Sequence, residues 1–144
     1  MLPKTKTGGF TLIEILVVIA IIAVLAAITI VALNPAQNLQ EARDTERSSS
    51  VNQILSAISQ WIVDGGAVSS LGLTACSSGV DNIGTSTGNI DLGTQLVPTY
   101  MVGIPTDPNG GTDADTGYDI CEEGTGRITI TAPNAETGAI SVSR

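Results

Sequence analysis

The stretch FTLIEILVVIAIIAVLAAITIVAL, from Phe10 to Leu33, decides the fold of this 144-residue chain. Three of its residues are not plainly apolar, namely Thr11, Glu14 and Thr29. As a helix that rises about 1.5 Å per residue, the stretch would be about 36 Å long, which exceeds the about 30 Å of a bilayer's hydrocarbon core. The sequence therefore predicts one long apolar helix that can span a membrane.

A secretory signal peptide is the alternative interpretation of this stretch. The apolar core of a signal peptide usually runs for about 7–15 residues and ends at a small-x-small cleavage site. The run here is longer and has no Ala-x-Ala, the nearest imitation being Val24-Leu25-Ala26. Gly8 and Gly9 instead precede the apolar run. A cut at this flexible pair would release a basic leader and leave the apolar helix attached to the rest of the chain as a membrane anchor.

The residues KTKTGGFTLIEILVVIAIIAVLAAI, from Lys4 to Ile28, resemble the N-terminus of a type IV pilin or pseudopilin precursor. Such precursors have a short basic leader, then Gly, Phe and Thr-Leu-Ile-Glu, and then an apolar helix. The resemblance implies cleavage after Gly9 by a membrane-embedded prepilin peptidase and N-methylation of the new terminus at Phe10. It also implies that an inner-membrane assembly platform adds identical subunits to a helical homopolymer.

Glu14 places a carboxylate near the start of the apolar helix. A charge in the middle of a membrane costs about 3 kcal/mol or more, and less near an end, so it persists where it is paired or functional. Cleavage after Gly9 would create a partner, because the Phe10 ammonium lies one helical turn from Glu14. Glu14 is therefore predicted to meet the ammonium of a neighbouring subunit during assembly. The alternative is that its side chain reaches the lipid headgroups and has no function.

The segment ALNPAQ predicts the end of the apolar helix, because Pro35 cannot donate to a carbonyl of the preceding turn. Asn34 as N-cap and Pro35 at the first helical position predict the start of a second helix. Apolar residues at helical spacing make this second helix amphipathic over 34–66: Val51, Ile54, Leu55, Ile58, Trp61 and Ile62. The charged residues 41–47 are either a solvated face or a polar collar that contacts neighbouring subunits.

The remainder, 67–144, is rich in Gly, Ser and Thr with short apolar runs, which predicts small strands and long connections. RITITA and AISV alternate apolar and polar residues and predict a hairpin that packs on the second helix. The predicted fold class is α+β and type IV pilin-like, with a small antiparallel sheet packed on the C-terminal half of a long N-terminal helix. The expected divisions are a cleaved leader (1–9), an apolar helix (10–33), an amphipathic helix (34–66) and a β-rich part (67–144).

Cys76 and Cys121 lie in the part expected to be exported, where thiols oxidise, and they predict a disulfide. In the loop-closure model such a cross-link stabilises the fold by about 4 kcal/mol. The alternative is a pair of free buried thiols. A redox or nucleophilic enzyme is disfavoured, because neither cysteine belongs to a Cys-x-x-Cys pair and the chain has no histidine.

The stretch DPNGGTDADTGYDICEE, from Asp107 to Glu123, is an acidic glycine-rich loop. Oxygen ligands alternating with glycine suit a hard cation such as Ca²⁺, although the spacing is not that of an EF-hand. The candidate ligands are Asp107, Asn109, Asp113, Asp115 and Asp119. The frame IPTDP…GY also resembles the C-terminal region of major pseudopilins of type II secretion systems, which implies calcium in the equivalent loop. The alternative is a solvated acidic turn, and no cofactor is required.

The net charge of −8 comes from the part of the chain beyond residue 50, so direct nucleic-acid binding is not expected. The resemblance implies a structural subunit, a major or minor pilin, of a type IV pilus-like extracellular filament. The subunit would wait in the cytoplasmic membrane as a single-pass precursor. The alternatives are a pseudopilin of a type II secretion system and, in another class, a membrane-anchored secreted enzyme or binding domain. No catalytic constellation supports the enzyme.

Overall fold

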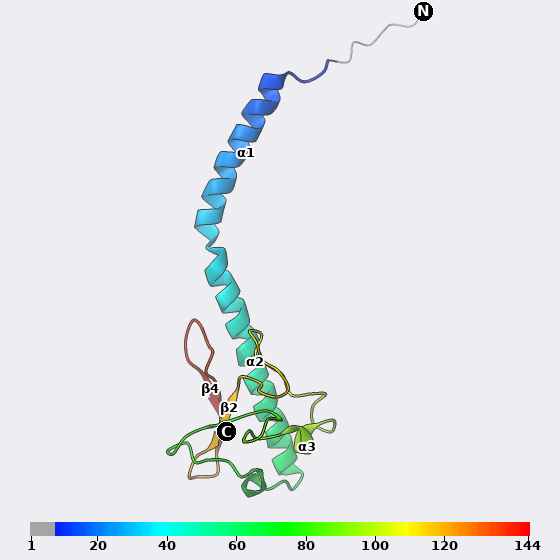
Figure 1. The fold of residues 1–144 in the computed structure, drawn as a ribbon, viewed down its shortest axis with the longest axis vertical. Coiled ribbons are helices and arrows are strands. Elements are labelled where there is room, and N and C mark those ends of the chain that lie inside the picture. The colour runs from blue at the N-terminus through cyan, green and yellow to red at the C-terminus, as the bar shows by residue number, and fades with distance from the viewer. Residues whose placement is uncertain (1–7) are drawn as a thin grey trace, which may run out of the picture. The chain divides into compact units, whose positions relative to one another are not determined.

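The computed structural model describes residues 8–144, and most of the predicted leader lies outside this range. Figure 1 shows a long N-terminal helix followed by a second helix and strands. The strands form a four-stranded sheet, which confirms the predicted α+β class and is consistent with a pilin-like fold. The chain divides into two compact units, residues 1–38 and 39–144. The elements in chain order are α1 (Leu12–Leu33), α2 (Pro35–Val63), the 3-10 helix η1 (Val68–Leu71), β1 (Asp81–Asn82), α3 (Gly93–Leu96), β2 (Asp119–Glu122), β3 (Ile128–Ala132) and β4 (Ile140–Ser143).

Helix α1 exposes apolar side chains all round, and by length and composition its residues Leu12–Ala32 are sufficient to cross a membrane. A helix that is apolar on every side is stable where lipid or other apolar helices surround it. The Thr29 hydroxyl donates to the carbonyls of Leu25 and Ala26, so it is satisfied within the helix. Glu14 is thus the one ionisable side chain of α1.

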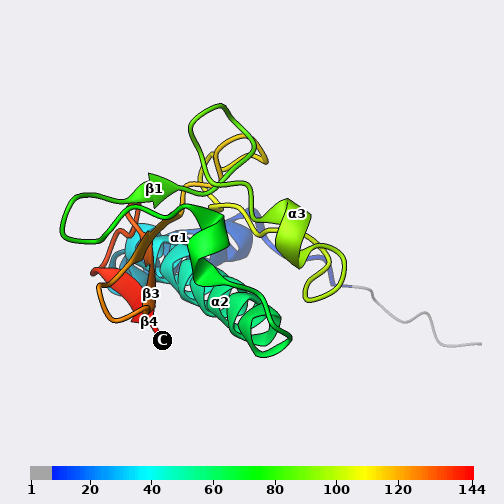
Figure 2. The same ribbon diagram turned by 90° about the horizontal axis from the view of Figure 1, so that it is seen from below.

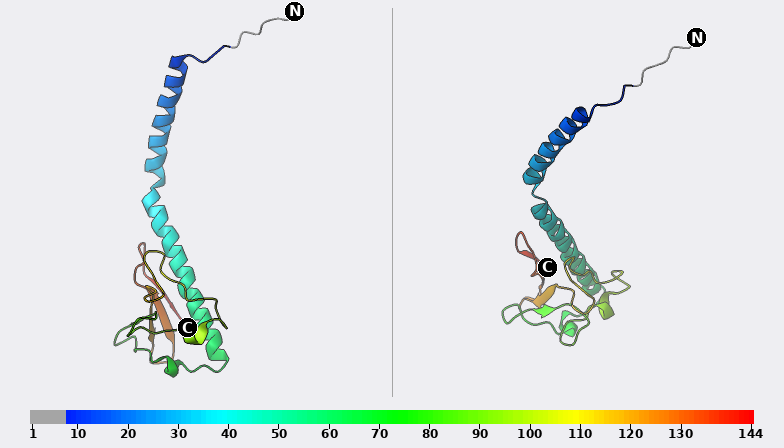
Figure 3. Two further views of the ribbon diagram at one scale, coloured as in Figure 1. Left: turned by 45° about the vertical axis from the view of Figure 1, so that its right-hand side comes forward. Right: turned by 45° about the horizontal axis from the view of Figure 1, so that its top comes forward.

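Helix α1 ends at Leu33, and Asn34 separates it from α2 with a left-handed backbone at φ +39°. Pro35 then opens α2, where its missing N–H leaves no hydrogen bond unmade. The Asn34 carbonyl accepts from the N–H of Gln37 at 3.1 Å, and its side-chain amide donates to the Gln37 side chain at 3.2 Å. The interruption between the two helices is visible in Figure 3.

The four strands form one antiparallel sheet in the order β1-β2-β3-β4. In β3 the side chains of Ile128, Ile130 and Ala132 are buried, whereas the intervening threonines are only half-buried. Ile130 pairs with Ile120 on β2 and with Val142 on β4. This alternation turns one face of the sheet toward the core.

The core of the second unit lies between that sheet face and helix α2, as the view along α2 in Figure 2 shows. Helix α2 contributes a buried stripe at helical spacing: Val51, Ile54, Leu55 and Ile58. Leu71, Ile83, Leu92 and Leu96 from the long connection between α2 and β2 complete the cluster. The core is small, because much of this connection is irregular and exposed.

A disulfide joins Cys76 to Cys121, as the sequence predicts. It links the connection after η1 to strand β2, and beside it the Cys76 N–H donates to the Glu122 carbonyl at 2.9 Å. The cross-link therefore holds an irregular segment against the sheet.

Replacing both cysteines with serine should lower the free energy of unfolding by about 4 kcal/mol, because the unfolded chain regains the entropy of a loop spanning a 45-residue separation. The measurement is thermal unfolding of the detergent-solubilised full chain. Reduced wild-type protein should unfold at the same lower temperature as the double variant. An unchanged unfolding temperature in both samples would contradict a stabilising role for the bond.

Candidate functional site

Gly8, Gly9 and Phe10 precede α1 without regular secondary structure, and Phe10 is 84% exposed. A Cβ atom added to Gly8 or Gly9 would meet no atom within 4 Å. The described fold therefore does not require glycine at either position. A requirement for glycine here would have to come from a partner that binds the segment, such as a peptidase.

Thr11 and Glu14 form a reciprocal cap at the start of α1. The backbone N–H and the hydroxyl of Thr11 both donate to Oε2 of Glu14, at 2.8 and 2.9 Å, while the Thr11 hydroxyl accepts from the Glu14 N–H at 3.3 Å. Such a cap satisfies backbone donors that the first helical turn leaves unpaired. It also holds the Glu14 carboxylate beside Thr11, the residue that follows Phe10.

The cap leaves the second oxygen of the Glu14 carboxylate available. Both Thr11 donors go to Oε2, and within residues 8–144 no hydrogen bond to Oε1 is present. The carboxylate is therefore held in place by its own chain while one oxygen remains free to accept from a cation outside it. This geometry suits the predicted meeting with a neighbour's Phe10 ammonium, which stays a prediction.

A second group of charged residues lies in the second unit, residues 39–144, which is called the outer unit from here on. It comprises Arg43, Asp44, Arg47, Asp107 and Glu136 and is here named the charged clamp. Arg47 is 0% exposed, and its Nε and Nη2 donate to the two carboxylate oxygens of Asp107 at 2.8 and 3.0 Å. Its Nη1 donates to Asp44 at 2.9 Å and to Glu136 at 3.0 Å. One guanidinium thus joins α2, the segment before β2 and the turn between β3 and β4.

Arg43 and Asp44 complete the clamp at that turn. Arg43 Nε and Nη2 donate to the two oxygens of Glu136, each at 2.6 Å. Asp44 accepts from the N–H groups of Glu136 and Thr137 and from the Thr137 hydroxyl. Every buried side-chain donor and acceptor among the described residues has a partner, as buried charges require.

These contacts keep all three carboxylates ionised. The Thr137 hydroxyl, acting against burial and aided by backbone N–H groups, holds the pKa of Asp44 far below its usual range. Hydrogen bonds from Arg43 and then Arg47 lower the pKa of Glu136 to about 2. Burial raises the pKa of Asp107, but the hydrogen bonds from Arg47 and the Asn109 N–H outweigh it, so the net shift is downward.

Helical spacing in the sequence predicts only one contact of this clamp, the Asp44–Arg47 pair at i, i+3, which the structure confirms. The sequence predicts the charged residues 41–47 on a solvated face or in contact with neighbouring subunits, whereas Arg43, Asp44 and Arg47 bind carboxylates and backbone of their own chain. Glu136 lies between the two predicted strands of the hairpin, where the sequence indicates only a turn. One signal was present, because Arg47 lies four residues before Val51 on the apolar stripe of α2, where a charge must be paired.

At least two of the five predicted calcium ligands have partners within the chain. Asp107 is committed to Arg47, and an oxygen of Asp115 accepts from the Gly117 N–H at 3.0 Å. Among residues 8–144 no group of three or more acidic, His or Cys side chains is placed to hold a metal ion. Calcium binding by this loop therefore stays a prediction from the sequence, and no function is assigned to the ion.

A family model described as the prokaryotic N-terminal methylation motif matches residues 4–30. The matched segment contains Gly9, Phe10, the Thr11–Glu14 cap and most of α1. No curated protein and no solved structure matches the chain. The match therefore identifies the N-terminal segment as this motif. The outer unit lies outside the match and is interpreted from its own residues.

The clamp predicts that the folded chain loses stability in acid. Because its carboxylates have lowered pKa values, the unfolded chain binds more protons as pH falls below about 5, and the free energy of unfolding should decline from there to about pH 2. Glu136→Gln should be less stable at neutral pH and show a shallower decline. Chemical unfolding across pH measures both, with Glu122→Gln on β2 as control. Equal slopes for wild type and Glu136→Gln would refute the contribution of Glu136.

Gly9→Val should block cleavage while leaving the described fold intact, because the branched side chain has space in the chain itself but obstructs a peptidase at the scissile bond. Uncleaved precursor should then accumulate in the membrane fraction, detected by gel mobility and N-terminal sequencing. Gly8→Val, one residue further from the cut, is the matched control and should be processed. Recovery of Gly9→Val chains that begin at Phe10 would show that the assigned cleavage site is wrong.

Proposed function

We propose that this chain, whose N-terminal segment fits a type IV prepilin-like signal, is a structural subunit of a type IV pilus-like extracellular filament. The motif supports the type IV pilin or pseudopilin class and points to a structural subunit and not to an enzyme. The observation that carries the proposal is the position of Glu14, whose carboxylate is held by the cap with Thr11 in the first turn of an exposed apolar helix. The exposed residues Gly9 and Phe10 come directly before this cap.

The motif implies processing by a prepilin peptidase, and the apolar helix suggests a membrane-anchored precursor. We infer that cleavage after Gly9 removes the basic leader and exposes the amine of Phe10, which is then N-methylated. The amine stays protonated after methylation, so it remains a cation that a carboxylate can bind. The subunit then carries one positive and one negative group at the same end of α1.

Polymerisation buries α1 among other copies of α1. Apolar side chains gain little by moving from lipid to a bundle of apolar helices, because both surroundings are equally apolar. The charges therefore select the register: a subunit whose Phe10 ammonium meets the Glu14 carboxylate of its neighbour leaves no uncompensated charge. A subunit displaced along the axis leaves two such charges in a medium of low dielectric, which costs several kcal/mol.

The outer unit would face the surroundings of the filament. Its disulfide suits an oxidising compartment, and the clamp joins distant segments of a unit whose core is small. Acidic groups dominate its surface, which favours solubility and disfavours a role in binding nucleic acid directly.

A pseudopilin of a type II secretion system is the second candidate, because the same N-terminal motif serves both classes. The IPTDP segment at residues 104–108 favours it by its similarity to major pseudopilins. A pseudopilin filament would remain short, so electron microscopy of sheared surface material distinguishes the two candidates.

Glu14→Val should insert into the membrane at least as well as wild type, because an apolar side chain replaces a charge. Its filament yield should nevertheless fall sharply, since the incoming subunit's ammonium would be left unpaired. Membrane-fraction yield and sheared-filament yield are measured in the same cells.

Glu14→Gln is the matched control for the cap, because its side-chain oxygen can still accept from Thr11 without carrying a charge. It should also fail to assemble. Normal filaments from Glu14→Gln would refute the pairing mechanism. If Glu14→Val then failed to assemble, the cap and not the charge would be what assembly needs.

A further inference from the structure

The turn at residues 107–110 opens the acidic glycine-rich loop and is bonded directly to the charged clamp. The Asn109 N–H donates to Oδ1 of Asp107 at 2.8 Å, and the same oxygen accepts from Arg47. The Gly111 N–H donates to the Asp107 carbonyl at 3.0 Å. The chain on both sides of the Asn109–Gly110 peptide is therefore anchored on one buried clamp residue, Asp107.

The peptide between these two anchors is accessible. Asn109 and Gly110 are both exposed, and within residues 8–144 neither the Asn109 side chain nor the Gly110 N–H makes a hydrogen bond. Gly110 has φ +95°, a left-handed backbone that residues with a side chain adopt only with strain. The turn thus requires glycine after Asn109, which is the one asparagine of the chain that glycine follows.

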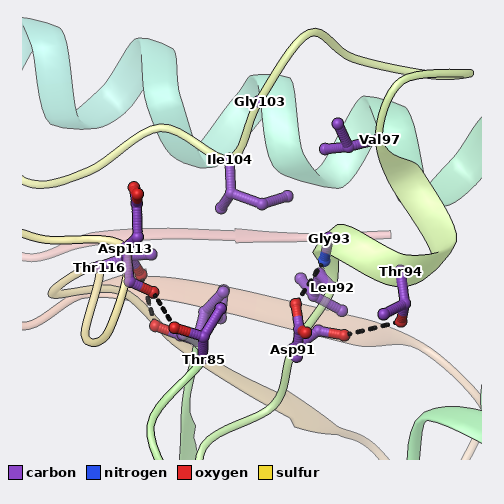
Figure 4. A pocket seen from close by; sticks show the side chains of 12 residues that line it. Thr85, Asp91, Leu92, Gly93, Thr94, Val97, Gly103, Ile104, Asp113 and Thr116 are labelled. Carbon is purple, nitrogen blue, oxygen red and sulfur yellow. Dashed lines mark hydrogen bonds between the residues drawn. The ribbon is translucent and has the colours of Figure 1, made fainter.

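The part of the loop beyond Gly110 is held firmly. The N–H and hydroxyl of Thr85 donate to the Asp113 carbonyl at 2.9 and 3.1 Å, and Figure 4 shows these two residues together at the wall of a pocket. Gly111 has no spare room, because a Cβ added there would clash with the Asp107 backbone. An extra backbone atom next to Gly110 could not be accommodated here without the loss of a contact.

We propose that Asn109 is a site of spontaneous covalent modification, in which its side-chain amide is converted to a carboxylate through reaction with Gly110, and that this conversion loosens the clamp. The Gly110 amide nitrogen loses its proton to hydroxide and attacks Cγ of Asn109. The new N–C bond closes a succinimide ring, while the bond from Cγ to the side-chain nitrogen breaks and releases ammonia. Water then opens the ring at either carbonyl, which gives aspartate or isoaspartate.

The fold favours this reaction at Asn109 and disfavours it at Asn82, which is also exposed. The Gly110 nitrogen has no side chain beside it and no hydrogen bond to break before it attacks. After Asn82, by contrast, the Ile83 N–H donates to the Tyr118 carbonyl at 2.9 Å, and the branched Ile83 side chain is buried. Exposed turns with small residues are also where backbone is least constrained.

Both products disturb the clamp at Asp107. Each places a new carboxylate near the one that Arg47 binds, and like charges repel most strongly where solvent screens them least. Isoaspartate also routes the chain through its side-chain carbons, which adds one backbone atom between the two hydrogen bonds that anchor the turn. Because Gly111 cannot move closer to Asp107, one of these hydrogen bonds is lost. Disturbing a buried ion pair destabilises the fold.

The first test incubates the detergent-solubilised full chain at mildly alkaline pH and then distinguishes asparagine, aspartate and isoaspartate by peptide mass spectrometry. Asn109 should lose its amide at least about tenfold faster than Asn82 in the same sample, which corresponds to a barrier lower by about 1.4 kcal/mol. The loss should quicken as pH rises, because the attacking nitrogen must first be deprotonated. Equal rates at the two asparagines, or an intact Asn109, would overturn the proposal.

Thermal unfolding of the incubated chain tests the effect on the clamp. Wild-type chain with converted Asn109 should unfold several degrees below fresh chain. Asn109→Gln is the matched control, because it keeps the backbone N–H that Asp107 accepts, while its longer side chain closes a ring far more slowly. It should unfold at the same temperature before and after incubation. An unchanged temperature for converted wild type, or an equal loss in Asn109→Gln, would refute the loosening of the clamp.

Discussion

The Glu14 carboxylate lies at the head of a helix whose other side chains are almost all apolar, and it cannot stay unpaired once that helix is buried. In the single chain its own Thr11 holds one oxygen, while the other is free within the described residues. This arrangement keeps the charge near the helix start and oriented before a partner is present. In the proposed filament, the need to compensate it within a bundle would give α1 a defined register, which apolar packing alone supplies poorly.

The outer unit solves a different problem, because it must remain folded with a small core and a long irregular connection. The clamp and the disulfide act at different places: Arg47 joins α2 to the segment around Asp107 and the turn at Glu136, and the disulfide joins the segment at Cys76 to β2. A buried guanidinium with three carboxylates is costly to desolvate, and removal of one partner is costlier still. Such a network favours one arrangement of the segments over alternatives that leave a charge unpaired.

The sequence is most informative where one local rule dominates. The apolar run predicts α1, Pro35 predicts its end, and alternation in residues 127–132 predicts a strand, because each depends on neighbours along the chain. Apart from the Asp44–Arg47 pair, which is three residues apart along α2, the clamp depends on contacts between residues 60 to 93 positions apart, which no local pattern encodes. Asp107 was therefore interpreted as a cation ligand from the acidity of its loop, although its charge is balanced by a distant arginine.

Mass spectrometry of the N-terminal peptide from sheared surface filaments tests the central claim most directly. The account predicts that the filament subunit begins at Phe10 and carries a methyl group on its α-amine, because cleavage after Gly9 creates the cation that pairs with Glu14. A filament subunit that retains Lys4 and Lys6, or that begins beyond Glu14, would contradict the account.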